Sequence, residues 1–449
     1  MNAINRRDFL KIVGISTASA APLLSSCSSQ GTGSEATGAL GEVPTDKMTY
    51  RTSPKGDKVS LLGYGCMRWP LLPAPEKGGN LIDQDAVNRL VDYAIEHGVN
   101  YFDTSPVYVQ GWSEKSTGIA LKRHPREKLF IATKLSNFQN WTRENSIAMY
   151  ENSFKDLQTD YFDYYLLHSI GNGGIETFRA RYIENGMIDY LVKEREAGRI
   201  RNLGFSFHGT KEVFDEVLAM HEQVHWDFVQ IQLNYVDWRH ATGRNVDAVY
   251  LYGELEKRGI PAIIMEPLLG GRLSNVPEHV MLRLKERMPQ SSVAGSPAKV
   301  LTVLSGMTYM EHLQDNIRTY SPLVPLSDDE LAFLEETAQL MMTYPTIPCN
   351  DCQYCMPCPY GIDIPAILLH YNKCVNEGNV PKSSSDENYR EARRAYLVGY
   401  DRSVPKLRQA SHCIGCEQCN SHCPQSIDIP KELHRIDEFV EQLKQETLG

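Results

Sequence analysis

Residues 100–108 read Asn-Tyr-Phe-Asp-Thr-Ser-Pro-Val-Tyr, an apolar run that stops at an aspartate and passes into a loop. Seven further apolar runs alternate with amphipathic helical patterns, and they cover residues 61–67, 129–134, 161–168, 200–206, 228–234, 261–265 and 300–304. Eight strand–helix units predict an α/β fold, a closed parallel (β/α)8 TIM barrel. The glycine fingerprint Gly-x-Gly-x-x-Gly is missing from the sequence, which argues against an open dinucleotide-binding sheet.

Four polar residues follow three consecutive strands of this barrel. Asp103, Lys134 and His168 each end an apolar run, and Tyr108 comes five residues after Asp103. Since a barrel brings the carboxyl ends of its strands to one face, we expect these side chains to meet there. A tyrosine hydroxyl is a weak acid with an ordinary pKa of about 10, and a buried ammonium beside it favours the phenolate. The set predicts a proton-transfer site in which Lys134 lowers the pKa of Tyr108 and Asp103 keeps Lys134 charged.

The chain resembles the aldo/keto reductase family along the whole barrel. Beside the tetrad, the resemblance rests on Leu-Gly-Phe-Ser at 203–206, Gln-Leu-Asn-Tyr at 232–235 and Glu-Pro-Leu-Leu-Gly-Gly at 266–271. It implies that Tyr108 is the general acid for carbonyl reduction and the base for alcohol oxidation, while His168 positions the substrate. It also implies that Ser206 and Gln232 hold the carboxamide of a nicotinamide.

Two departures from the family pattern concern the cofactor. Met265 stands where an aromatic residue usually stacks on the nicotinamide, and methionine packs there with less specific geometry. The segment 304–316 matches the adenosine-binding loop, but Gly306 and His312 replace the Lys and Arg that usually hold a 2′-phosphate. Without these charged donors the preference for NADP loses its basis. We therefore expect NAD over NADP, with Asp315 and Asn316 as adenine contacts.

Eight of the 11 cysteines form two tight motifs, Cys349-x2-Cys352-x2-Cys355-x2-Cys358-Pro and Cys413-x2-Cys416-x2-Cys419-x3-Cys423-Pro. The second motif has the spacing of a ferredoxin that binds 4Fe–4S clusters. Zinc is the alternative metal, but four-cysteine zinc sites usually consist of two separated Cys-x2-Cys pairs. The helical patterns around the motifs resemble the α-helical ferredoxin domains of respiratory iron–sulfur subunits, and a subset of aldo/keto reductases carries such a region.

Eight cysteines predict two clusters. In a ferredoxin the fourth cysteine of each motif binds the other cluster, so one cluster takes Cys349, Cys352, Cys355 and Cys423, and the other takes Cys413, Cys416, Cys419 and Cys358. The first motif is one residue short before Cys358, which leaves a single cluster as the alternative.

The N-terminus resembles a targeting signal. Residues 5–11 read Asn-Arg-Arg-Asp-Phe-Leu-Lys and precede a weakly apolar stretch, as in a twin-arginine export signal. Leu-Ser-Ser-Cys at 24–27 looks like a lipobox, which predicts a lipid anchor on Cys27; an amphipathic arm is the alternative to the whole signal. We expect a signal and tether over residues 1–45, the barrel over 46–344 and the cluster region over 345–449, in a protein exported to the periplasm or another extracytoplasmic space.

Composition and motifs together indicate an oxidoreductase. The formal net charge of −10 offers nucleic acid no countercharge. We expect hydride transfer between a nicotinamide and a small carbonyl or alcohol substrate, a sugar among the candidates, with the clusters passing electrons to a partner protein. The alternative is a non-catalytic electron-transfer or membrane-associated subunit in which the barrel is only a scaffold. The complete tetrad favours the enzyme.

Overall fold

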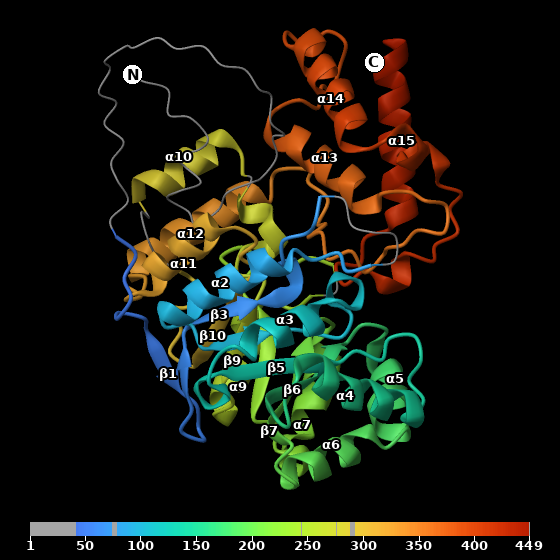
Figure 1. Cartoon of the computed structure of the whole chain (residues 1–449). Helices are drawn as coiled ribbons and strands as arrows, with labels where there is room; N and C mark the ends of the chain where they lie inside the picture. Colours follow the sequence, from blue (N-terminus) through green and yellow to red (C-terminus); the bar gives the residue numbers. More distant parts are fainter. Residues whose placement is uncertain (1–41, 74–78, 244, 275, 288–291, 449) are drawn as a thin grey trace.

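The protein is a closed eight-stranded barrel followed by a helical region, as the barrel and C-terminal helices of Figure 1 show. The computed structural model describes residues 42–73, 79–243, 245–274, 276–287 and 292–448. The strands are β3 (Leu62–Gly65), β4 (Tyr101–Asp103), β5 (Phe130–Leu135), β6 (Phe162–Ile170), β7 (Ile200–Phe207), β8 (Phe228–Gln232), β9 (Ala262–Met265) and β10 (Val300–Ser305). All pair in parallel, and β10 closes the ring against β3. The predicted barrel is confirmed.

Amphipathic helices surround the strands, as their sequence periodicity requires. Helix α2 begins after Asp83, whose side chain accepts a hydrogen bond from the Ala86 amide, and it buries Val87, Leu90, Val91 and Ala94 against the barrel. The helices between the strands and after them are α2 (Gln84–Glu96), α3 (Ser113–Leu121), α4 (Arg143–Leu157), α5 (Gly174–Phe178), α6 (Met187–Glu196), α7 (Lys211–Ala219), α8 (His221–Val224), α9 (Ala248–Arg258), α10 (Glu278–Arg287), α11 (Met310–Tyr320) and α12 (Asp328–Met341).

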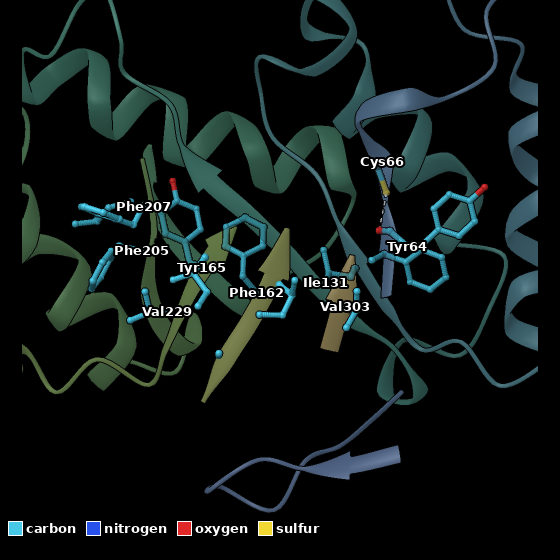
Figure 2. Packing of buried hydrophobic residues seen from close by; sticks show 14 of the residues in the cluster. Tyr64, Cys66, Ile131, Phe162, Tyr165, Phe205, Phe207, Val229 and Val303 are labelled. Atoms are coloured by element: carbon cyan, nitrogen blue, oxygen red, sulfur yellow. Dashed lines mark hydrogen bonds between the residues drawn. The ribbon is translucent and has the colours of Figure 1, made fainter. Parts of the chain in front are cut away.

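The barrel wall is packed on both sides by large apolar side chains. Figure 2 shows part of the main cluster, in which the ring of Phe162 stacks on Tyr165 with 5.4 Å between centroids. Inside the floor of the barrel a second, smaller cluster forms around Tyr164, Phe228 and Val59. Val59 belongs to an antiparallel hairpin, β1 (Tyr50–Thr52) with β2 (Lys58–Ser60), that closes this end. The interior is therefore solid, and the open face is the one where the strands end.

The cysteine region has its own core. Helices α13 (Ile364–Asn376), α14 (Tyr389–Ser403) and α15 (Ile429–Gln445) pack together around Tyr396, Leu433 and other buried residues. The two cysteine motifs end alike, in Cys-Pro-x-x-Ile-Asp-Ile-Pro at residues 358–365 and 423–430. In both copies the aspartate, Asp363 or Asp428, caps the following helix, whose first turn contains the proline. Each motif is thus fixed directly to a helix N-terminus.

The predicted export signal and Cys27 lie outside the described residues. Within the ranges given above, no helix combines the length and apolar composition needed to cross a membrane.

Candidate active site

The four predicted tetrad residues meet at the carboxyl ends of neighbouring strands. Asp103 is the last residue of β4, Lys134 lies in β5, and His168 lies in β6. Tyr108 begins the short helical turn Tyr108–Gly111 that follows β4. All four side chains are buried, and Lys134 has no exposed surface at all.

Lys134 is held by a buried ion pair. Its Nζ donates to Asp103 Oδ1 at 2.5 Å and to the Thr104 carbonyl oxygen at 2.8 Å, and it lies 5.1 Å from the centroid of the Tyr108 ring. Burial lowers the pKa of Lys134 and raises that of Asp103, and the pairing opposes both shifts. The pair sits beneath the tyrosine ring with its charges mutually compensated.

Tyr108 keeps its proton more firmly than the sequence predicted. We expected Lys134 to lower the pKa of Tyr108. Instead burial raises that pKa well above its ordinary value, and Tyr354 and Asp103 add to the rise. The physical reason is that the ammonium donates to Asp103 and Thr104 and that the phenol lies in a poorly solvated site. The phenol is thus protonated at neutral pH and gives up its proton less readily than a solvated tyrosine.

His168 is a neutral imidazole in this site. Burial lowers its pKa well below the ordinary value, and nearby Lys134 and Arg181 lower it further. Its Nδ1 forms a hydrogen bond of 2.6 Å with Ser136 Oγ, so the ring orientation is fixed and Nε2 faces the tyrosines. A neutral ring can orient an oxygen atom but carries no charge of its own.

A cavity of about 300 Å³ extends from the tetrad across the barrel mouth. Of the predicted cofactor residues, Ser206, Met265 and Asn316 line it, as do Gly306 and His312. Gln232 and Asp315 do not. The Gln232 amide donates to Asp237 behind the strand ends, and Asp315 forms an ion pair of 3.1 Å with Arg318. The structure therefore places these two outside the cavity, because each is engaged with a neighbour in its own segment.

Two residues that the sequence did not single out offer open polar atoms to the cavity. Ser169 Oγ and Gln230 Oε1 are buried, line the cavity and have no hydrogen-bond partner among the described residues. A hydroxyl and an amide oxygen left open in this way match the carboxamide of a nicotinamide. The chain thus fits the cofactor that the resemblance implied. Gln230 points to the same side of β8 as Gln232, so the period of the strand could have indicated it.

Strained backbone gathers around this cavity. Ser169, Glu266 and Leu269 have φ of 56°, 52° and 51°, and Val109 and Gln110 beside Tyr108 have φ of 50° and 53°. Left-handed conformations at residues other than glycine cost about 1–3 kcal/mol each and concentrate at functional sites. Their positions mark the barrel mouth as the working face.

The eight motif cysteines form no disulfide, and six of them pack in or against the core of the cluster region: Cys349, Cys355, Cys358, Cys413, Cys419 and Cys423. Burial raises the pKa of Cys349 to about 11, and Cys423 is among the thiols that act on it. Burial likewise raises the pKa of Cys419 to about 11, with contributions from Cys413, Cys416 and Cys358. Cys423 therefore lies near Cys349 and Cys355, and Cys358 lies near Cys419, as the ferredoxin spacing predicts.

Comparison with known proteins agrees with this geometry. The model of the aldo/keto reductase family matches residues 61–287, just over half of the chain. The chain belongs to the aldo/keto reductase family. The barrel of this aldo/keto reductase is 26% identical over 310 residues to L-galactose dehydrogenase of Arabidopsis thaliana, which covers 64% of the chain and 92% of that protein.

Two further relatives show the range of the similarity. Methylglyoxal reductase YeaE of Escherichia coli is 36% identical over 140 residues, 30% of this chain and 45% of the relative. A crystal structure of an aldo-keto reductase from Klebsiella pneumoniae in complex with NADPH superposes with a TM-score of 0.50 at 19% identity, covering 64% of this chain and 95% of that one. At this identity the structural likeness shows the fold alone.

A second family model, the 4Fe–4S dicluster domain, matches residues 348–429 of this aldo/keto reductase. The range holds all eight motif cysteines. Two such clusters require eight cysteine donors, and the two motifs supply eight, so the residue types present fit the group; within the described residues no three metal-ligating side chains converge on one point.

The loop Cys349–Cys355 lies across the mouth of the barrel. Asn350, Cys352 and Tyr354 line the same cavity as Tyr108 and His168. The Tyr354 hydroxyl lies 3.3 Å from His168 Nε2, and Tyr354 contributes to the raised pKa of Tyr108. No local pattern in the sequence indicated this contact, because it joins residues far apart in the chain.

Proposed function

We propose that this aldo/keto reductase transfers a hydride between a nicotinamide and the carbonyl carbon of a small aldehyde, ketone or sugar, or the reverse with the alcohol. The observation that carries the proposal is the joint placement of Tyr108 and His168 over the Lys134–Asp103 pair at one end of a cavity. Ser169 and Gln230 leave open polar atoms in the same cavity.

The roles of the residues follow from their environment. A nicotinamide, when bound, supplies or accepts the hydride. Tyr108, kept protonated by burial, donates its phenolic proton to the carbonyl oxygen during reduction and takes it back during oxidation. His168 orients the oxygen through Nε2, since its Nδ1 is engaged by Ser136. Lys134 places a positive charge beside the Tyr108 ring, where it stabilises negative charge that develops on the phenol oxygen.

For the cofactor we propose NAD rather than NADP. Of the Lys and Arg side chains in the described residues, Arg68 lines the cavity, and it is already bonded to Asp351 at 3.2 Å. Gly306 and His312 offer no permanent charge to a 2′-phosphate.

We further propose that the clusters pass single electrons to or from a partner protein. Cys416 is exposed, whereas Cys352 lines the cavity. Thiols of both motifs, Cys349 of the first and Cys419 of the second, contribute to the raised pKa of Cys355. The two motifs therefore lie next to each other. Ile414, between two of the outer cysteines, is 63% exposed and offers an apolar contact.

The predicted export belongs to the same proposal. A nicotinamide pool is not expected outside the cytoplasm, so an exported and lipid-anchored enzyme needs a cofactor that stays bound and is recycled in place. Twin-arginine export favours this, because proteins on that route fold and load their cofactors before they cross. Anaerobic purification of the mature protein, followed by iron, sulfide and nicotinamide analysis, tests it. Retained NAD(H) with about eight irons supports the proposal, and a cofactor-free cytoplasmic protein contradicts it.

Turnover tests the enzymatic core of the proposal. Nicotinamide absorbance is followed with NADH or NADPH and methylglyoxal, and with NAD⁺ or NADP⁺ and L-galactose, the compounds named in the relatives. We expect Tyr108→Phe to abolish turnover. The matched control is Tyr161→Phe, at the opposite end of the barrel, where the Tyr161 ring packs against Arg126 and Arg201 and is kept by the substitution. Absence of turnover in the wild type would favour the scaffold alternative, and equal rates in both variants would remove Tyr108 from the mechanism.

A further inference from the structure

The phenol of Tyr354 lies beside the two catalytic side chains, Tyr108 and His168. Its hydroxyl lies 3.3 Å from His168 Nε2, and it lies close enough to the Tyr108 phenol to raise the pKa of that phenol. Its ring packs against Phe138 with 5.9 Å between centroids, and Phe138 in turn packs on His168 at 5.0 Å. The polar end of Tyr354 thus meets both groups that handle the substrate oxygen, while its ring holds the side chain in place.

The position of Tyr354 is set from the cluster region. The residue stands between Cys352 and Cys355, two of the thiols assigned to one cluster, so iron bound there fixes the chain on both sides of it. The loop is also fastened to the barrel. Asn350 Nδ2 donates to Glu266 Oε1 at 2.7 Å, and Arg68 donates to the Asn350 carbonyl oxygen at 2.9 Å.

We propose that Tyr354 is a positioning residue for Tyr108 and His168, and that the catalytic site is complete only when the cluster of Cys349, Cys352, Cys355 and Cys423 is loaded. The inference rests on the proposed hydride transfer. It assigns to the cluster region a task in the barrel chemistry that is separate from electron transfer: the region contributes a hydroxyl that holds the phenol and the imidazole in register. A protein whose cluster region lacks iron would then be a poor catalyst, although its barrel still carries the complete tetrad.

The kinetic test removes only the hydroxyl. Tyr354→Phe keeps the ring against Phe138, so we expect substrate affinity to persist while alignment is lost. The expected result is a fall in kcat of about 10- to 100-fold with KM changed less than about 3-fold. The matched control is Tyr360→Phe, an exposed tyrosine two residues after Cys358, which should leave both constants unchanged. An unchanged or raised kcat in Tyr354→Phe overturns the proposal.

Hydrogen exchange gives a readout that needs no substrate. In the iron-loaded wild type, the peptide spanning Thr104–Trp112 should exchange slowly, and Tyr354→Phe should speed it several-fold at unchanged iron content. Anaerobic removal of iron by a chelator should speed it equally in the wild type and add nothing in Tyr354→Phe. The control is helix α7 of the barrel, which should exchange at the same rate in every sample.

The outcomes separate the two claims. No turnover by the wild type would count against the proposed function, whereas the exchange data would still decide the role of Tyr354. Protection of the Tyr108 peptide that does not respond to iron removal overturns the coupling. Loss of iron from Tyr354→Phe overturns it as well, because the hydroxyl would then serve the cluster rather than the catalytic pair.

Discussion

Asn350 and Glu266 join the cluster region to the barrel through a hydrogen bond of 2.7 Å. Glu266 directly follows β9, and Asn350 directly follows the first cysteine of the first motif. Burial raises the pKa of Glu266 to about 7, and its second oxygen has no partner among the described residues. The two parts of the chain therefore meet at the catalytic cavity itself and not at a remote surface.

This contact makes Gly270 sensitive to substitution. A Cβ at Gly270 would meet the Cβ of Asn350 and lie 2.7 Å from its carbonyl oxygen, whereas a Cβ at Gly259 meets nothing within 4 Å. Both glycines have positive φ, 64° and 68°, so alanine suffers the same backbone strain at each. We expect Gly270→Ala to lower the free energy of unfolding by about 1–3 kcal/mol more than Gly259→Ala. Urea unfolding checks this; equal losses would show that the loop does not pack as described.

The Lys134–Asp103 pair predicts a non-additive effect. Lys134→Met leaves a buried carboxylate without its partner, which costs about 3–5 kcal/mol of stability. Adding Asp103→Leu should restore most of the stability, because no isolated charge remains, yet turnover should stay lost. Denaturant unfolding and kinetics on the single and double variants measure the two effects. Stability that does not recover in the double variant would argue against charge compensation.

The protonation of Tyr108 predicts the alkaline side of the pH profile. Because Tyr108 must hold its proton to reduce a carbonyl, the rate falls only as pH rises through its pKa, which burial raises above the ordinary value. We expect kcat/KM for reduction to show no alkaline limb due to Tyr108 below about pH 10. An alkaline limb near pH 8 that disappears in Lys134→Met would contradict this and would show that Lys134 lowers the pKa of Tyr108, as the sequence suggested. The groups that bear on Tyr108 are Tyr354, Asp103, Cys66, Lys134 and His168.

The exchange of the fourth cysteines predicts an iron count. In a Cys352→Ser background that has lost one cluster, Cys423→Ser should remove no further iron, since both belong to the same group. Cys358→Ser should remove the remaining irons, about four, because Cys358 lies with Cys419. Iron and sulfide analysis of anaerobically prepared variants decides. The opposite pattern would mean that each motif binds its own cluster.

The sequence predicted the barrel strands to within a few residues, because long apolar runs that alternate with helical patterns have few other solutions. It missed the hairpin of Tyr50–Thr52 with Lys58–Ser60, since strands of three residues carry no readable period. The tetrad was predicted because strand ends are brought to one face by the topology alone.

The remainder of the site depends on contacts that no local pattern reveals. Gln230 and Gln232 share one face of β8, but Gln232 bonds to Asp237 while Gln230 bonds to Met265 and lines the cavity. Tyr354 lies between two cysteines that dominate its segment, and its contact with His168 joins residues 186 positions apart. Such choices follow from how the cluster region docks on the barrel, which the spacing of the cysteines does not encode.

Transfer of label from the cofactor tests the central claim most directly. The wild-type protein is supplied with NADH carrying deuterium at the reactive carbon and with methylglyoxal, and the alcohol product is examined by mass spectrometry. Hydride transfer predicts one deuterium on the carbinol carbon of the product. Tyr108→Phe, which we expect not to turn over, should form no labelled alcohol. Unlabelled alcohol, formed with electrons from a reduced dye while NADH is not consumed, would contradict the account.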